Sequence, residues 1–196
     1  MSTVVLLGAS GLVGSHVLPR LLAHPQVSSV VAPVRRPLPH SAPGLEPVRV
    51  DFEQLPAQAP WWQADALICA LGTTRAQAGS AAGLRRVDHD YPLQAAALAR
   101  AAGTRCLVLV SATGANAASP LHYNRVKGEL EDGLRAQGWP SLVLVRPGLI
   151  GGQRATRRPA EHAAGVVLGA LGPLLPRRWR ISPAEHIAAA LTRQAA

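Results

Sequence analysis

Two residues whose chemistry can act together lie four positions apart in the segment Tyr123-Asn124-Arg125-Val126-Lys127. Side chains at this spacing share one face of a helix. An ammonium group beside a phenol favours the phenolate, so Lys127 is expected to lower the pKa of Tyr123 toward the working pH. Tyr123 is therefore predicted to act as a general acid or base toward a carbonyl or an alcohol. A solvated pair on a helix surface has the same spacing, so the prediction depends on support from other positions.

The chain has a single lysine, Lys127, among its 20 basic residues. A position that stays lysine in so arginine-rich a sequence indicates a place where the larger, planar guanidinium does not fit. We expect Lys127 also to donate to the ribose hydroxyls of a nucleotide. A further hydroxyl, which polarises the substrate oxygen, is predicted at the end of the strand that precedes this helix. Ser111 is the first choice for it and Thr113 the second.

A glycine-rich turn near the N-terminus is suited to holding phosphates. Four apolar residues run into Gly8-Ala9-Ser10-Gly11-Leu12-Val13-Gly14, and apolar residues then recur at helical spacing. Strand, tight turn and helix are the context of a dinucleotide fingerprint, although the spacing here is GxxGxxG. The first glycine permits the turn, the second lets a pyrophosphate approach the backbone, and the third lets the helix pack closely. An ordinary strand-turn-helix is the alternative. The residues predicted to bind the cofactor here are Gly8, Ser10, Gly11, Leu12 and Val13.

The next apolar run, 27–34, is predicted to be the second strand, and it ends in Arg35-Arg36. In dinucleotide folds the end of this strand meets the adenine ribose, where a carboxylate selects a free 2′-hydroxyl. No carboxylate occurs between Met1 and Leu45, and a pair of arginines suits a 2′-phosphate. The sequence therefore predicts NADP, with NADPH preferred over NADH. A solvated arginine pair in a Pro-containing loop is the alternative.

Strands alternate with helices along the rest of the chain. Further strands are predicted at 47–50, 65–71, 105–110 and 141–145, and further helices at 82–102 and 122–137. This alternation predicts an α/β fold, a single doubly wound Rossmann-type domain over 1–196 with a mostly parallel sheet. The segment 151–196 is Arg-rich and then helical, and it is predicted to form a small C-terminal cap over the substrate region.

Composition excludes several classes of protein. The net charge is +9, but aromatic residues make up only 4% of the chain, so the basic clusters lack the stacking partners of a nucleic-acid surface. No apolar run is long enough to span a bilayer, and no signal peptide is expected. Cys69 and Cys106 lie in apolar runs without metal-ligand spacing, which indicates buried free thiols, no metal and a cytoplasmic location. We expect a small-molecule partner, no nucleic acid, no membrane, and a monomer or homodimer.

Four segments together resemble a known superfamily. They are Cys69–Arg75 (CALGTTR), Ser111–Asn116 (SATGAN), Tyr123–Glu129 (YNRVKGE) and Arg146-Pro147-Gly148. With the glycine turn they resemble the short-chain dehydrogenases/reductases, in the atypical branch typified by the HIV Tat-interacting protein family of NADP-binding oxidoreductases. Where that family has paired serines after the fifth strand, the second residue here is Ala112, which leaves the choice between Ser111 and Thr113 open.

The resemblance implies a set of cofactor contacts along the chain. It implies NADPH held by the glycine turn and by Arg35-Arg36, with further contacts from Asp51, Phe52, Ala70, Leu71, Gly72, Lys127, Pro147, Gly148 and Leu149. The function it favours is NADPH-dependent reduction of a small carbonyl compound, with Tyr123 as proton donor. A cofactor-binding regulator or redox sensor without turnover is the alternative. An isomerase or dehydratase that uses NADP transiently shares every motif, and the fold does not separate these functions.

Overall fold

A computed structural model of the chain describes residues 1–39, 41–151 and 181–195. A parallel sheet of six strands, in the order β3-β2-β1-β4-β5-β6, lies at its centre. The strands are β1 Ser2–Leu7, β2 Val27–Val34, β3 Leu45–Arg49, β4 Ala66–Cys69, β5 Cys106–Val110 and β6 Ser141–Val145. The order reverses direction between β1 and β4, which is the switch point where open α/β sheets bind ligands.

Helices connect the strands. They are α1 Gly14–Leu22, η1 Pro60–Trp62, α2 Arg75–Ala78, α3 Ala81–Arg85, η2 Arg86–Asp90, α4 Tyr91–Ala101, α5 His122–Ala136 and α7 Ala184–Ala195. Two short strands, β7 Leu149–Gly151 and β8 Ile181–Pro183, pair in a separate parallel sheet. None of the helices in the described part of the chain combines the length and apolar character that a bilayer span requires.

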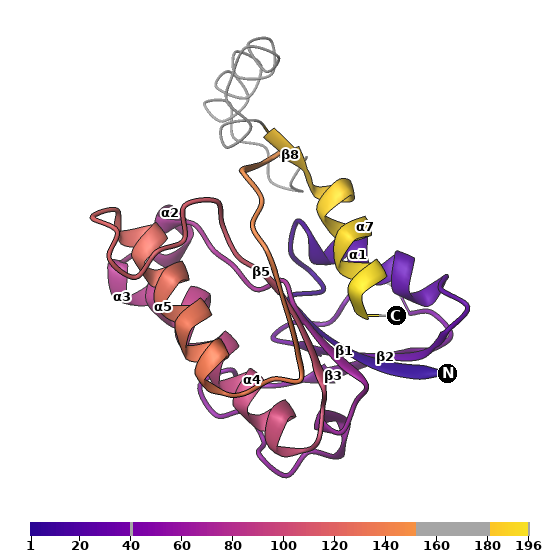
Figure 1. Cartoon of the computed structure of the whole chain (residues 1–196). Coiled ribbons are helices and arrows are strands. Elements are labelled where there is room, and N and C mark those ends of the chain that lie inside the picture. The colour runs from indigo at the N-terminus through magenta and orange to yellow at the C-terminus, as the bar shows by residue number, and fades with distance from the viewer. Residues whose placement is uncertain (40, 152–180, 196) are drawn as a thin grey trace.

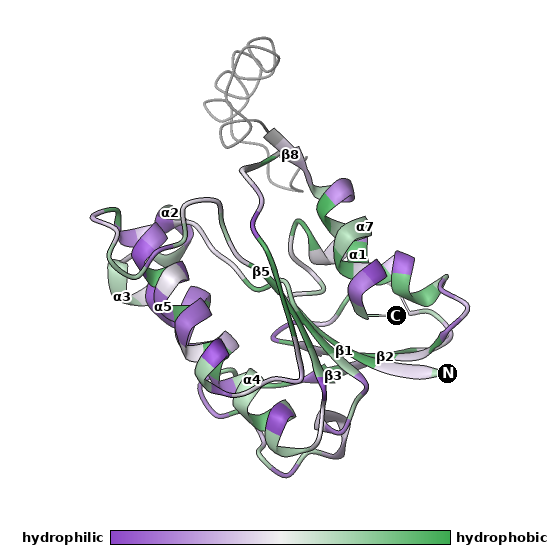
Figure 2. Ribbon diagram, viewed as in Figure 1, coloured by the Kyte–Doolittle hydropathy of each residue, from purple (hydrophilic) through white to green (hydrophobic). Residues whose placement is uncertain are grey.

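Helices cover both faces of the sheet, which gives three layers (Figure 1). α1 and α7 lie on one face, and α4 and α5 lie on the other. Strand β1 contributes side chains to both cores, because successive side chains of a strand point to opposite faces of the sheet. Val4 and Leu6 belong to the core under α1 and α7, whereas Val5 and Leu7 belong to the core under α4 and α5. Figure 2 shows the resulting apolar centre of the sheet.

These observations confirm the predicted α/β Rossmann-type fold. The predicted bounds of β2 and β6 agree with the structure, and α5 ends one residue before the predicted 122–137 helix. The helix predicted at 82–102 is instead divided, because a π-helical segment, η2, separates α3 from α4. A π-helical turn adds a residue to the helical repeat and shifts which side chains face inward. Asp88 and His89 are buried as a result.

The C-terminal helix helps to complete the core. α7 packs beside α1, and Ile187 and Leu191 are buried in the core that the two helices share. This part of the segment 151–196 therefore covers a face of the sheet. The prediction of a cap for the remainder stays a prediction, because residues 152–180 lie outside the described residues.

Candidate functional site

The glycine turn has the geometry expected of a phosphate cradle. Gly8 has φ +85°, a conformation that L side chains rarely adopt. A Cβ added to Gly14 would lie 2.0 Å from the Gly8 carbonyl oxygen, so helix α1 begins in close contact with the turn. A Cβ added to Gly11 would lie 3.1 Å from the same oxygen, so a side chain there would crowd the turn. The first turn of α1 has no acidic residue, which leaves the helix N-terminus favourable to an anion.

The turn lies against the loop that follows β4. A Cβ added to Gly8 would lie 2.7 Å from the Ala70 carbonyl oxygen, and the Ala70 N–H donates to the Leu7 carbonyl at 2.9 Å. Leu71 is half-buried and Gly72 is exposed. The structure therefore brings the predicted glycine turn and Ala70-Leu71-Gly72 together at the switch point of the sheet.

The residues predicted for the adenine end differ in exposure. Arg35 and Arg36 are exposed directly after β2, where a 2′-phosphate would lie in a dinucleotide fold. Asp51 is exposed, and its Oδ1 accepts from the Glu53 N–H at 2.9 Å. Phe52 is only 4% exposed, and its ring packs on that of Tyr91 with centroids 5.6 Å apart. Most of the Phe52 side chain therefore belongs to the core.

Tyr123 and Lys127 lie in the first turns of α5, on one face. Tyr123 is 38% exposed, whereas Lys127 is 2% exposed. The Lys127 Nζ lies 3.0 Å from Asp88 Oδ1 and donates to the Val110 carbonyl, the last of β5, at 3.4 Å. The ammonium is thus held at the carboxyl end of the sheet, next to a tyrosine that solvent can reach.

The charge balance of this pair differs from the expectation. Desolvation raises the pKa of Tyr123, the Lys127 ammonium lowers it and the Asp88 carboxylate raises it, and the net direction is upward. The predicted lowering of the Tyr123 pKa is therefore wrong for this structure, because desolvation of the phenol, together with the Asp88 carboxylate, outweighs the effect of the Lys127 ammonium. Burial lowers the pKa of Lys127, but Asp88 and Tyr123 raise it, and the net value lies above the ordinary 10.5.

Sequence reasoning missed Asp88. This residue is fully buried, and its Oδ2 accepts from the Thr73 N–H at 2.8 Å while Oδ1 faces Lys127. In the sequence it lies in Arg86-Val87-Asp88-His89, a charged stretch that is typical of a helix surface. The π-helical segment turns it inward, and no regular helical periodicity predicts that.

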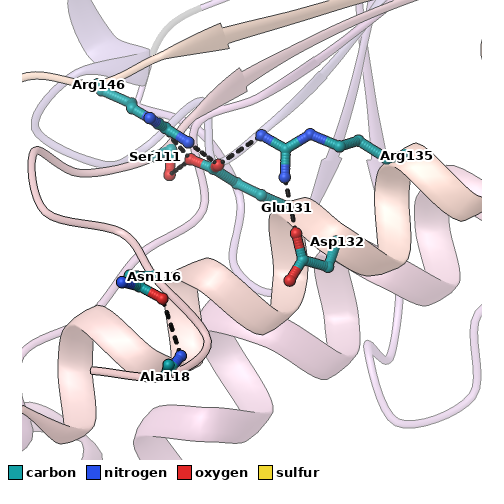
Figure 3. A network of polar contacts seen from close by, with 7 residues as sticks. All are labelled: Ser111, Asn116, Ala118, Glu131, Asp132, Arg135 and Arg146. Carbon is teal, nitrogen blue, oxygen red and sulfur yellow. Dashed lines mark hydrogen bonds and ion pairs between the residues drawn. The ribbon is translucent and has the colours of Figure 1, made fainter. Parts of the chain in front are cut away.

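Ser111 is placed in a different environment from the one predicted. Its hydroxyl donates to Glu131 Oε1 at 2.5 Å, and the residue is 1% exposed. Glu131, one turn beyond Lys127 on α5, also accepts from Arg146 and Arg135 (Figure 3). The Ser111 hydroxyl is therefore engaged in a buried ionic network, which argues against its predicted contact with a substrate oxygen.

The alternative hydroxyl lies at the same end of the sheet. Thr113 is half-buried, its Oγ1 donates to the Arg146 carbonyl at 3.0 Å, and its N–H donates to the Pro147 carbonyl at 2.8 Å. The Gly148 N–H donates to the Ser182 hydroxyl at 3.2 Å. The predicted Pro147-Gly148 turn therefore joins the loop after β5 to β8. The side chain of Leu149 lies outside the described residues.

The described residues contain no cluster of three or more His, Cys, Asp or Glu side chains that could hold a metal ion. Cys69 and Cys106 are free thiols, buried and half-buried respectively. Burial raises the pKa of the Cys69 thiol to about 11, although it lies near Lys127. Cys69 is therefore protonated near neutral pH and is a poor nucleophile.

The comparisons with known proteins agree with this geometry. Residues 8–165 match the model of a family described as NAD(P)H-binding. Protein fmp52 of Emericella nidulans is 40% identical over 180 residues, covering 88% of this chain and 77% of the relative. Protein HTATIP2 of Rattus norvegicus is 39% identical over 181 residues, covering 90% of this chain and 73% of the relative. These matches confirm the resemblance that the motifs predicted.

Solved structures share the fold at low sequence identity. MoeE5 in complex with UDP-glucose and NAD has a TM-score of 0.74 and 17% identity, covering 99% of this chain and 72% of that one. The Bordetella bronchiseptica enzyme WbmH in complex with NAD⁺ has a TM-score of 0.71 and 15% identity, covering 100% and 72%. Both support a nicotinamide dinucleotide fold.

One sequence expectation is corrected by the comparisons. The cytoplasmic location was inferred from two free thiols in apolar runs, Cys69 and Cys106. The fungal relatives are named mitochondrial, which contradicts that expectation. Reduced thiols are compatible with several compartments, so cysteine usage alone did not distinguish them.

Proposed function

Since this chain belongs to the NAD(P)H-binding family, in the atypical short-chain dehydrogenase/reductase branch that includes HTATIP2, we propose that it reduces a small carbonyl compound with NADPH. One observation supports this most strongly. The sole lysine of the chain is buried beside an accessible tyrosine, at the same end of the sheet as the glycine turn. A helix surface pair would not bury its ammonium.

A series of contacts connects the glycine turn with Tyr123 and Lys127. The glycine turn touches Ala70, and Gly72 lies beside Asp88. The Thr73 N–H donates a hydrogen bond to the Asp88 carboxylate, which also forms an ion pair with the Lys127 ammonium. A dinucleotide whose pyrophosphate lies at Gly11 would therefore extend its nicotinamide half along this path, toward the first turns of α5.

The proposed chemistry needs one proton and one hydride. NADPH, when bound, supplies the hydride to the carbonyl carbon. Tyr123 donates its phenolic proton to the carbonyl oxygen, and its raised pKa keeps that proton in place at neutral pH. Lys127 stabilises the phenolate that remains and contacts the ribose. This arrangement suits Tyr123 as the proton donor in carbonyl reduction.

Thr113 is the better choice for the polarising hydroxyl. It keeps accessible surface, whereas Ser111 is buried and donates to Glu131. A hydroxyl that polarises a substrate oxygen has to be free to turn toward it, and Thr113 requires only the loss of a bond to a carbonyl. Thr113→Val is expected to lower kcat more than Ser111→Ala does.

The cofactor preference follows from the exposed arginines after β2. A charge-assisted bond to a phosphate contributes about 1.5–3 kcal/mol, so each of Arg35 and Arg36 is expected to favour NADPH over NADH by about tenfold to a hundredfold. Calorimetric titration with both cofactors tests this. Equal affinities would contradict the proposed role of the pair.

The activity itself is tested by NADPH oxidation. NADP(H) retained on the purified protein would be measured first, and a panel of aldehydes and ketones would then be screened. Tyr123→Phe removes the proton donor and is expected to lower turnover by about 10²–10⁴-fold, with NADPH affinity nearly unchanged. Lys127→Arg keeps the charge without the compact geometry, so both turnover and NADPH binding should weaken.

The regulator or sensor alternative makes the opposite prediction for Tyr123→Phe. A protein that binds NADPH without turnover moves no proton, so this variant would behave as the parent does in every assay. Lys127→Arg titrated with NADPH serves as the matched measurement, because it needs no substrate. If that variant binds NADPH as tightly as the parent, Lys127 does not contact the ribose.

A further inference from the structure

Asp88 stands at a meeting point of three segments that are distant in the sequence. Its carboxylate accepts from the Thr73 N–H at 2.8 Å and lies 3.0 Å from the Lys127 ammonium. The side chains of Asp88 and Lys127 are 1% and 2% exposed. Removing two charges from water costs several kcal/mol per ion, and their mutual attraction offsets this cost only when the geometry is good, so neither ion can lose its partner without a large penalty.

The backbone around Asp88 is unusual at the same place. Asp88 lies in η2, a π-helical segment between two α-helices. π-helical segments are rare in proteins overall, and those that occur are often found at functional sites. Here η2 directs the Asp88 carboxylate toward Thr73, in the loop after β4, and toward Lys127 on α5. A Cβ on Gly72 would lie 3.5 Å from Asp88 Oδ1, so this loop passes directly over the carboxylate.

We propose that Asp88 is a positioning residue, whose carboxylate fixes the Lys127 ammonium at the end of β5 and sets the charge that Tyr123 experiences. The inference rests on the proposed function for the meaning of Tyr123, but the ion pair and its effect on Tyr123 exist without a substrate. Asp88 acts on Tyr123, the proposed proton donor, through Lys127. It also connects Lys127 to Thr73 in the loop after β4.

The groups that face this pair determine the sign of the effect. Tyr123 is influenced by Lys127 and Asp88, and Lys127 is influenced by Asp88, Tyr123 and Cys69. A negative charge favours the protonated form of every neighbour. Removing the charge of Asp88 should therefore move the coupled titrations of both Lys127 and Tyr123 to lower pH.

The chain offers a direct spectroscopic test. It has two tyrosines, so Tyr91→Phe leaves Tyr123 as the sole source of phenolate absorbance. In that background, Asp88→Asn should move the phenolate titration to lower pH. Asp90→Asn is the matched control, because it removes a carboxylate from the same segment whose side chain is 52% exposed. A titration that Asp88→Asn leaves at the parent position overturns the proposal.

A second measurement needs no variant and covers the case in which Asp88→Asn does not fold. Protein labelled with ¹⁵N-lysine gives one side-chain signal, from Lys127, because the chain has one lysine. The ammonium should be visible at neutral pH and should lose its proton above 10.5, the ordinary value for lysine. Loss of the proton near neutral pH, where burial alone would favour the neutral amine, would contradict the proposed ion pair with Asp88.

Measuring turnover separates a failure of the proposed role of Asp88 from a failure of the proposed carbonyl reduction. With a carbonyl substrate in hand, Asp88→Asn should lower kcat by about 100-fold, as a displacement of about 1 Å in a reacting group can do. Its pH profile should also move to lower pH, which a purely structural loss would not cause. If no carbonyl is reduced by any form of the protein, the proposed function fails, and the two titrations still decide the role of Asp88.

Discussion

Glu131 is the residue whose replacement gives the sharpest test of the core around the site. Its carboxylate is 1% exposed, and it accepts from the Ser111 hydroxyl, from Arg135 and in two bonds from Arg146 (Figure 3). Glu131→Gln keeps the shape but removes the charge. The amide also presents a donor to guanidinium groups that require an acceptor.

The magnitude follows from burial and from the exposure of the partners. Removing one partner of a buried ion pair costs about 3–5 kcal/mol. The side chains of Arg135 and Arg146 are 48% and 46% exposed, so water can solvate the charges that remain. We therefore expect the lower end, about 3 kcal/mol, which corresponds to a fall in Tm of about 6–12 °C for a chain of this size.

The pH dependence gives a second and independent signature. Desolvation raises the pKa of Glu131, but the bonds from Arg146 and Ser111 lower it, and the net value lies below the ordinary 4.5. A carboxyl group whose pKa is depressed by folding stabilises the fold above the unfolded pKa and loses that contribution as the pH falls through the folded pKa. The gap between parent and Glu131→Gln should thus be constant near neutral pH and shrink below about pH 4.5.

Urea unfolding at neutral pH and at several acidic pH values measures both quantities. Asp132→Asn is the control, because this neighbour also pairs with Arg135 but its side chain is 62% exposed. Surface pairs contribute about 0.2–1 kcal/mol, so the control should lie close to the parent. If Glu131→Gln is as stable as Asp132→Asn, or if its deficit persists unchanged in acid, the network does not stabilise the protein as a buried ion pair.

Three further predictions concern single features of the fold. Gly128→Ala should destabilise the protein by about 1–3 kcal/mol in urea unfolding, because a Cβ there would lie 2.1 Å from the Ala117 nitrogen and 2.2 Å from the Asn116 carbonyl carbon; an unchanged midpoint would contradict the close packing. Cys69, with its pKa raised to about 11, should react with a thiol reagent at mildly alkaline pH more slowly than Cys106, as mass spectrometry of the two peptides would show. An amine-specific reagent should modify the α-amino group of the folded protein and spare Lys127, which is 2% exposed; rapid labelling of Lys127 in native protein would mean that the ion pair with Asp88 opens readily.

The sequence predicted the parts of the fold in which local pattern and burial agree. β2 and β6 were delimited correctly, because each is rich in valine or leucine and is followed directly by arginine. Tyr123 and Lys127 were paired correctly on α5, since a spacing of four residues fixes a shared helical face.

The remaining site residues depended on contacts between distant segments. Asp88 was missed because its partner, Lys127, is 39 positions away and because a π-helical segment changes the direction of its side chain. Ser111 was preferred over Thr113 because it follows the strand directly. In the structure its hydroxyl instead donates to the buried carboxylate of Glu131 on α5. Such competition between partners is a tertiary property, and the residue types around Ser111 carry no sign of it.

The position of β3 at one edge of the sheet bears on how copies of the chain can associate. An edge strand exposes unpaired N–H and C=O groups, which another chain can use to extend the sheet and to aggregate. In β3, Pro47 has no N–H to offer, and the neighbouring Glu46 and Arg49 carry charge. Growth of the sheet past β3 is therefore disfavoured, and a homodimer that joins two sheets into one would have to avoid this edge.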